Sequence, residues 1–230
     1  MRRISRYLPL FVLLLFFVRF AAAQSSVDFG MSFGAAQDKA NTTGIDQNTF
    51  LSCNPATSST CSPTPALSGF FLGFGGDLML WKHFGVGGEA NFQTSKQNYA
   101  VLQPAIPSVG QPQINLQSRV TFYDFNAIAE PVSAKRVGLR FYGGIGGANI
   151  RFYENATGSN ALVGNFNSSQ YAASSNHFQV HGGVGVELFL TEHFFIRPEF
   201  DVHWVNNFIQ FGRDVATREA VWVGYSFGER

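Results

Sequence analysis

The side chains best able to do chemistry lie at alternate positions of one stretch near the C-terminus, residues 194–204. Arg197, Glu199, Asp201 and His203 recur at every second position, and the positions between them are all apolar. In an extended strand such residues share one face, because successive side chains point to opposite sides. A base, two acids and a histidine on one face could act as general acid and base, or neutralise one another as ion pairs.

The same alternation places polar side chains on the inner face of other segments. We therefore expect one interior network of charged and polar groups, made of Asp77, Glu89, Asp124, Asn126, Arg140, His181, Glu187, Arg197, Glu199, Asp201 and His203. Counted from the short connections, six of them should share one layer near one end: Asp77, Glu89, Asn126, Arg140, Glu187 and Arg197. Because acids outnumber bases in the network, we expect His181 or His203 to be protonated, or one carboxyl group to retain its proton.

The elements that must position these groups are eight segments in which apolar residues alternate with small or polar ones. They cover residues 27–35, 68–80, 85–94, 116–130, 137–150, 178–190, 194–204 and 220–227. Most are close to the length of a tilted membrane-spanning strand. Short connections at 81–84, 131–136 and 191–193 alternate with long ones at 36–67, 95–115 and 151–177. This arrangement predicts an all-β fold, an eight-stranded antiparallel up-and-down transmembrane β-barrel with its long loops outside the cell.

A barrel of eight strands is just wide enough for side chains to fill its interior. We therefore interpret the charged layer as a packed salt-bridge plug, with a pore constriction or gate as the alternative. Glycine-rich repeats at 73–77, 85–89 and 182–187 lack the spacing of a phosphate-binding loop. On a narrow inner face, such glycines leave room for the charged side chains opposite.

The N-terminus has the three parts of a secretory signal peptide. Basic residues at positions 2, 3 and 6 precede an apolar run at 8–18 and three alanines at 21–23. We expect cleavage after Ala23, so that residues 24–230 form a single barrel domain. Cleavage would leave 12 of the 16 basic residues against 15 acidic ones, and no basic patch supports a nucleic-acid partner.

The composition favours contact with lipid. Only 13% of the residues are charged, whereas the surface of a soluble protein is about 25–35% charged. The chain also contains 25 phenylalanines. An exported chain with few charges and many aromatic residues is better explained by a lipid-facing wall than by a surface in water.

The two cysteines, Cys53 and Cys61, lie in a stretch rich in Ser, Thr and Pro. Export to an oxidising compartment predicts one disulfide closing a small loop, which contributes about 2–3 kcal/mol in the chain-entropy model. A metal-binding or redox-active pair would need a nearby His or a Cys-x-x-Cys spacing, and neither is present. We expect no metal, no cofactor and no catalytic residue.

Two stretches carry a resemblance to a known family: Gly-Gly-Val-Gly-Val-Glu-Leu-Phe-Leu-Thr-Glu-His-Phe-Phe-Ile-Arg-Pro-Glu-Phe at 182–200 and Val-Trp-Val-Gly-Tyr-Ser-Phe at 221–227. The chain resembles the small bacterial outer-membrane β-barrels, including the transmembrane domain of outer membrane protein A and the opacity-type, porin-like adhesins. The resemblance implies the bacterial outer membrane as the location, with insertion by machinery that reads a terminal aromatic residue. Here Phe227 is followed by Gly-Glu-Arg, a departure from that pattern.

These observations predict a monomeric outer-membrane protein with a structural or surface-interaction role, in contact with membrane lipid and, through its loops, with an extracellular ligand. Two alternatives within the membrane are a narrow pore and an enzyme that modifies lipid A. In the enzyme, His203 beside Asp201 and Glu199 would be the base and Ser226 the nucleophile. A soluble lipocalin-like barrel would place the apolar face inside, and the scarcity of lysine on the polar face argues against it.

Overall fold

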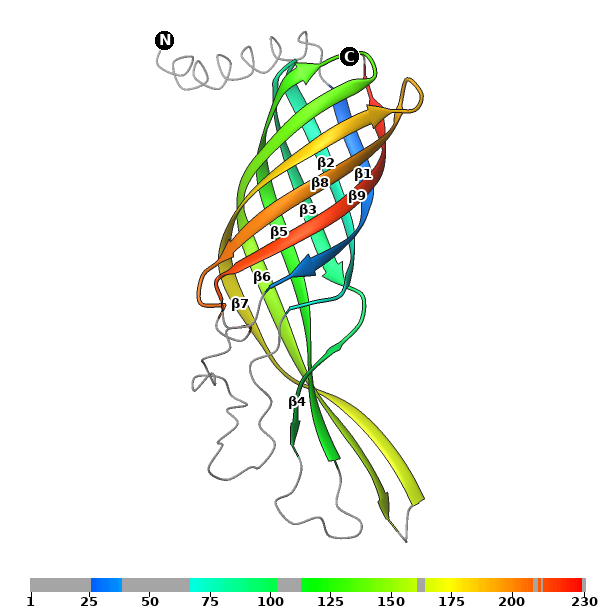
Figure 1. The fold of residues 1–230 in the computed structure, drawn as a ribbon, viewed down its shortest axis with the longest axis vertical. Coiled ribbons are helices and arrows are strands. Elements are labelled where there is room, and N and C mark those ends of the chain that lie inside the picture. Colours follow the sequence, from blue (N-terminus) through cyan, green and yellow to red (C-terminus); the bar gives the residue numbers. More distant parts are fainter. Residues whose placement is uncertain are drawn as a thin grey trace, which may run out of the picture.

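The strands of the computed structural model form one antiparallel sheet that closes on itself (Figure 1). The structure describes residues 26–38, 67–102, 113–160, 164–208, 211 and 213–228. The expected signal peptide and both cysteines, Cys53 and Cys61, lie outside these residues. The strands are β1 (Ser26–Gln37), β2 (Phe70–Trp81), β3 (Phe84–Gln93), β4 (Gln97–Leu102), β5 (Gln113–Ser133), β6 (Val137–Asn160), β7 (Gly164–Phe189), β8 (Phe194–Val205) and β9 (Val215–Phe227).

Two pairings between strands that are not consecutive in the chain close the ring. β1 pairs with β9 along its whole length, from Val27 opposite Phe227 to Gln37 opposite Thr217. β3 pairs with β5, so the ring contains eight strands and leaves β4 out. The predicted eight-stranded antiparallel barrel is confirmed. No helix in the described part of the chain is long and apolar enough to cross a membrane.

The alternating sequence of each strand is matched by alternating burial of its side chains. In β8, Arg197 and His203 are buried, whereas Phe200 and Trp204 on the opposite face expose 42% and 51% of their surface. β-branched and aromatic residues suit such a pleated wall, because each side chain packs against its neighbours on the same face. The sequence pattern therefore determines which side chains enter the barrel.

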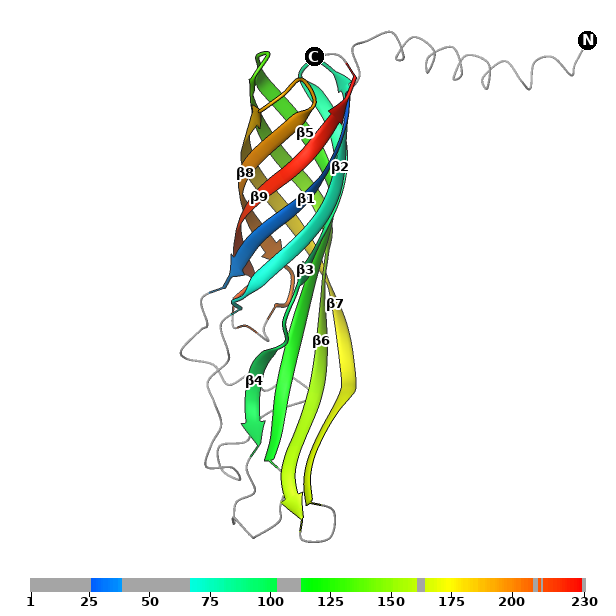
Figure 2. The ribbon, with the colours of Figure 1, turned by 90° about the vertical axis from the view of Figure 1, so that its right-hand side faces the viewer.

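The strands next to the long connections extend further than the sequence predicts. Loops were expected at 95–115 and 151–177, but β4 occupies part of the first, and β6 and β7 continue through most of the second. β4 and the outer parts of β5, β6 and β7 project beyond the ring as a continuation of the same sheet (Figure 2). In this extension the inner strands β5 and β6 are paired on both sides by neighbouring strands, so their backbone N–H and C=O groups are hydrogen-bonded without a lipid-facing wall.

The loop-side rim carries a buried acid, Asp38, which forms an isolated bridge with Leu67. Burial raises the pKa of the Asp38 carboxyl to about 7; Arg213 opposes the shift and Asp214 adds to it. The folded protein thus holds this proton more tightly than the unfolded chain, in which an aspartate ionises near pH 4. Ionisation of Asp38 therefore destabilises the fold progressively as the pH rises from about 4 through 7.

Replacing Asp38 by asparagine should remove this part of the pH dependence. Between about pH 5 and about pH 8, the free energy of unfolding should fall less in Asp38→Asn than in the unmodified protein. Urea unfolding of both proteins at both pH values measures this difference. Because the two proteins differ only at Asp38, the comparison removes the contribution of the other titrating groups. Parallel pH profiles for the two proteins would contradict the assignment.

Candidate functional site: the charged lumen

The barrel is apolar outside and polar inside. Phe125 and Ile145 on the outer face expose 63% and 56% of their surface, whereas Arg140, Glu187 and His203 on the inner face are fully buried. Other outward side chains are Phe29, Met31, Phe33, Phe74, Leu78, Phe141, Phe178, Val180, Val184, Leu188, Phe194, Val221 and Val223. This distribution is the reverse of that in a soluble barrel, so the lipocalin-like alternative does not apply.

Arg140 is the centre of the network on the short-turn side. Its guanidinium lies 2.6 Å from Asp28 Oδ2, 3.1 Å from Asp77 Oδ2, 2.8 Å from Glu130 Oε2 and 3.0 Å from Glu187 Oε2. These four carboxylates come from β1, β2, β5 and β7, and Arg140 itself from β6. One buried cation thus connects five strands across the lumen.

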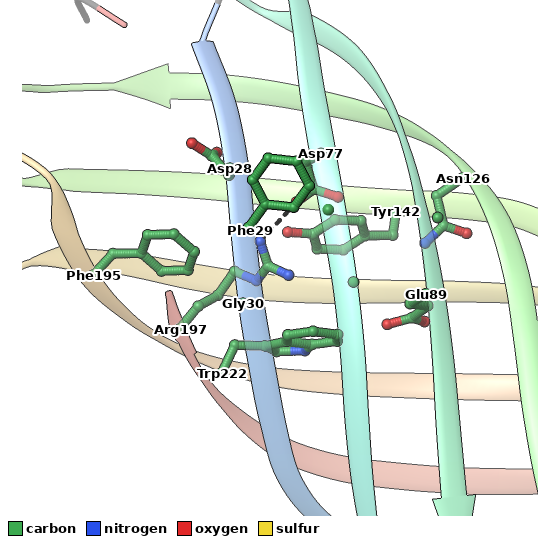
Figure 3. Close-up of a pocket in the computed structure, with 13 residues that line it drawn as sticks. Asp28, Phe29, Gly30, Asp77, Glu89, Asn126, Tyr142, Phe195, Arg197 and Trp222 are labelled. Atoms are coloured by element: carbon green, nitrogen blue, oxygen red, sulfur yellow. Dashed lines mark hydrogen bonds and ion pairs between the residues drawn. The ribbon is translucent and has the colours of Figure 1, made fainter. Parts of the chain in front are cut away.

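Arg197 of β8 continues the network beside an aromatic wall. Its Nη1 lies 2.8 Å from Asp77 Oδ2, and its Nε lies 3.1 Å from Glu199 Oε2. The guanidinium also lies 5.1 Å from the ring centres of Tyr142 and Trp222, within the range of cation–π attraction. Figure 3 shows Arg197 reaching toward Asp77 between these rings.

A second buried arginine cluster lies further toward the loops. Arg218 of β9 donates to Asp201 Oδ2 at 2.6 Å, to Glu199 Oε1 at 2.9 Å and to Glu89 at 3.2 Å. The indole N–H of Trp222 also donates to Glu199 Oε1, at 2.7 Å. Glu199 therefore links the Arg197 and Arg218 clusters.

Amides and histidines form the next layer toward the loops. His181 Nε2 lies 2.5 Å from Asn126 Oδ1, and Gln179 donates to Asp124 Oδ1 at 2.7 Å. The His203 ring is stacked between Phe122 and His181, with ring centres 4.7 and 5.2 Å away. This layer joins the charged network to the apolar residues at the rim.

Apolar side chains close the lumen at both ends. On the loop side, a buried cluster includes Phe71, Phe122, Phe208 and Phe211. On the short-turn side, Phe189 and Phe195 pack with Trp222. The cavity drawn in Figure 3 has a free volume of about 10 Å³, close to the minimum for one water molecule.

The expected residues all face the lumen, but they do not form the expected single layer. Asp77, Arg140, Glu187 and Arg197 are brought together, whereas Glu89 lies with Arg218 and Asn126 lies with His181. Sequence analysis missed three members of the network: Asp28, Glu130 and Arg218. Asp28 and Glu130 lie within the predicted strands 27–35 and 116–130, and Arg218 lies two residues before the predicted strand 220–227, so following each alternation to its ends would have found all three.

Glycines on the inner face make room for the charged groups, as the sequence suggested. A Cβ atom at Gly183 would overlap Asp201 Oδ1, and one at Gly87 would overlap Asp77 Oδ1. Gly183→Ala should therefore lower the free energy of unfolding by about 1–3 kcal/mol, as overpacking does. Gly143→Ala is the control, because a Cβ atom there meets nothing within 4 Å. Urea unfolding of both variants tests the comparison, and equal stabilities would contradict it.

The lipid A-modifying enzyme would need Ser226 close to His203. Ser226 lies opposite Asp28 at the short-turn end, and His203 lies opposite Ala216 near the loops. Ala216 and Ser226 are ten positions apart on β9, or about 33 Å along the strand. The proposed nucleophile and base therefore do not meet.

A closed eight-stranded barrel with an apolar outer wall and an ion-paired interior is a transmembrane β-barrel. The family model described as the outer membrane protein beta-barrel domain matches residues 8–227. The chain belongs to this family and is a protein of the bacterial outer membrane.

The solved structures similar to this chain are small outer-membrane proteins. Ail, the attachment invasion locus protein of Yersinia pestis, solved with the heparin analogue sucrose octasulfate, is 14% identical with a TM-score of 0.47; the match covers 87% of this chain and 99% of Ail. Neisserial surface protein A is 13% identical with a TM-score of 0.39, and the match covers 90% of this chain and 97% of that protein. OprG from Pseudomonas aeruginosa is 15% identical with a TM-score of 0.37, and the match covers 90% of this chain and 97% of OprG. No curated protein sequence matches the chain.

Proposed function

We propose that this protein is a non-conducting, non-enzymatic barrel that acts as a structural anchor and presents a surface for interaction outside the cell. The observation that carries the proposal is the interior network of Arg140, Arg197 and Arg218, which contacts carboxylates from strands around the ring. Apolar clusters lie on both sides of this network. Ions would have to break several buried ion pairs at once to pass, and doing so is costly in a water-poor interior.

Planar lipid bilayers test the absence of conduction. The purified protein, inserted at increasing amounts, should give no stable conductance steps, while an open porin of 16–18 strands conducts in the same membrane. Reproducible steps from the unmodified protein would support the narrow-pore alternative and contradict the proposal.

Mass spectrometry of lipid A from expressing and non-expressing cells should show identical species, and a new species would support the enzyme.

The surface role is supported by the sheet formed where β4 to β7 project beyond the ring (Figure 2). It lies on the side of the long connections, which faces outward in barrels of this kind. Its strands carry polar residues such as Asn149, Arg151 and Ser169, which suit contact with water or a polar ligand. We infer that this extension forms the contact surface of a monomer.

Protease treatment of intact cells tests the orientation. Cleavage should occur within residues 150–177 and leave the strands of the ring intact. As a control, the short turns should become accessible only after the outer membrane is permeabilised. Protection of 150–177 in intact cells, or recovery of the protein from the soluble periplasm, would contradict the proposed orientation or location.

A further inference from the structure

Three potential metal ligands converge in the lumen between the Arg218 cluster and the apolar loop-side rim. They are Asp124 of β5, His181 of β7 and His203 of β8, and one ligand atom from each lies within 4.8 Å of the other two. The three residues are between 0% and 7% exposed. Gly144 of β6 lies beside His181 and Asn126, and a Cβ atom there would collide with both. The glycine therefore allows side chains from β5 and β7 to approach each other across β6.

All three residues have buried polar atoms that lack hydrogen-bond partners within the described part of the chain. These atoms are His181 Nδ1, both ring nitrogens of His203, and Asp124 Oδ2. Buried polar atoms are normally hydrogen-bonded, so several polar atoms without partners at one place require an explanation. A bound cation would contact one of these atoms from each of the three residues.

The remaining polar atoms of His181 and Asp124 are held in the way that metal ligands usually are. With its Nε2–H donating to Asn126 Oδ1, His181 keeps a lone pair on Nδ1 that is available to a metal ion. Gln179 Nε2 donates to Asp124 Oδ1 and leaves Oδ2 free. Glu89 Oε1 lies 4.0 Å from His181 Nδ1 and supplies a further oxygen at the edge of the site.

The charge of the lumen also favours a cation. Among the described residues, three buried guanidinium groups, those of Arg140, Arg197 and Arg218, face a larger set of buried carboxyl groups. That set is Asp28, Asp77, Glu89, Asp124, Glu130, Glu187, Glu199 and Asp201. A surplus of buried negative charge is costly unless cations compensate for it. A dication bound by Asp124 and the two histidines would reduce that surplus.

We propose that Asp124, His181 and His203 bind a divalent transition-metal ion, of which Zn²⁺ fits the donors best. Two imidazole nitrogens and one carboxylate oxygen form a common zinc ligand set, whereas Mg²⁺ and Ca²⁺ prefer oxygen ligands alone. Because zinc–ligand bonds are about 2.0–2.2 Å long, small side-chain rotations must bring the ligand atoms closer when the ion binds. Since the lumen is packed at both ends, the ion enters as the barrel folds. This proposal departs from the expectation of no metal that we drew from the sequence, in which the three ligands are distant from one another.

Metal content after refolding tests the proposal. Tag-free protein is refolded in detergent with ZnSO₄ and desalted to remove excess metal. Its zinc content is then measured by elemental mass spectrometry. About one zinc per chain is expected in the unmodified protein, and at least a tenfold lower content in His203→Gln and Asp124→Asn. His83→Gln and His193→Gln, which change histidines at the short turns, are matched controls and should retain the full zinc content.

Refolding with Co²⁺ keeps the test decisive if a ligand variant fails to fold. Bound Co²⁺ in the unmodified protein should show the intense visible absorption of a low-coordinate site with nitrogen ligands. A zinc content near zero, the weak spectrum of six-coordinate Co²⁺, or loss of zinc in His83→Gln or His193→Gln would overturn the proposal. Migration on gels with and without heating confirms that each variant is folded. These outcomes do not depend on whether the barrel conducts.

Discussion

Replacing Arg140 by methionine should lower the free energy of unfolding by about 3–5 kcal/mol, the largest effect expected from any single lumen residue. Methionine fills a similar volume, but it leaves four buried carboxylates without the cation that they share. Urea unfolding in phospholipid vesicles, followed by tryptophan fluorescence, measures the loss. On gels, the variant should also change from the migration of the folded barrel to that of the unfolded chain after heating to a lower temperature than the unmodified protein needs.

Two further variants identify the cause of this effect. Arg136→Met makes the same substitution on the exposed turn before β6 and should change stability by less than about 0.5 kcal/mol. Adding Asp28→Asn and Glu187→Gln to Arg140→Met should recover part of the loss, because both changes remove negative charge that Arg140 no longer balances. Equal stabilities of Arg140→Met and Arg136→Met would show that the network does not hold the strands together.

Replacing Phe74 by arginine should destabilise the membrane-inserted barrel by about 2–4 kcal/mol. Phe74 is close to the middle of β2, points outward and exposes 47% of its surface. A charge there enters the hydrocarbon, where water cannot solvate it. Phe70→Arg is the matched control: Phe70 also points outward, but it begins the strand near the membrane surface, where the cost falls to about 0–1 kcal/mol. Unfolding in vesicles should separate the two variants, and equal losses would contradict the proposed membrane position.

The sequence predicts the barrel wall well because the two sides of the wall face different solvents. Wherever lipid lies outside and charged groups lie inside, as in β8, the alternation is sharp and the inward residues follow from it. In the extension of β6 and β7 both faces can meet water, so the alternation fades and the sequence resembles a loop. The start of β9 is also difficult to predict from the sequence, because the charged Glu219 points outward beside the inward-facing Arg218 and interrupts the alternation.

The contacts within the lumen are harder to predict than the residues that face it. Counting from the turns places Glu89 and Asn126 at the height of Arg140, but strand tilt and the stagger between strands move them to the Arg218 and His181 layers. The convergence of Asp124, His181 and His203 depends on the same stagger and on Gly144. Sequence alone gives the inward residues, and the stagger decides which of them meet.

The pairing of β1 with β9 has a consequence for how the protein is made. The first and last strands of the barrel become neighbours, so the wall is complete only after the whole chain has been synthesised and exported. Until then Asp28 on β1 has not reached Arg140, and Arg218 on β9 has not reached Glu89. Contacts so distant in sequence slow folding. A partly assembled sheet would expose an unpaired edge and uncompensated charges to lipid, so insertion should proceed as a single cooperative step with no stable half-barrel.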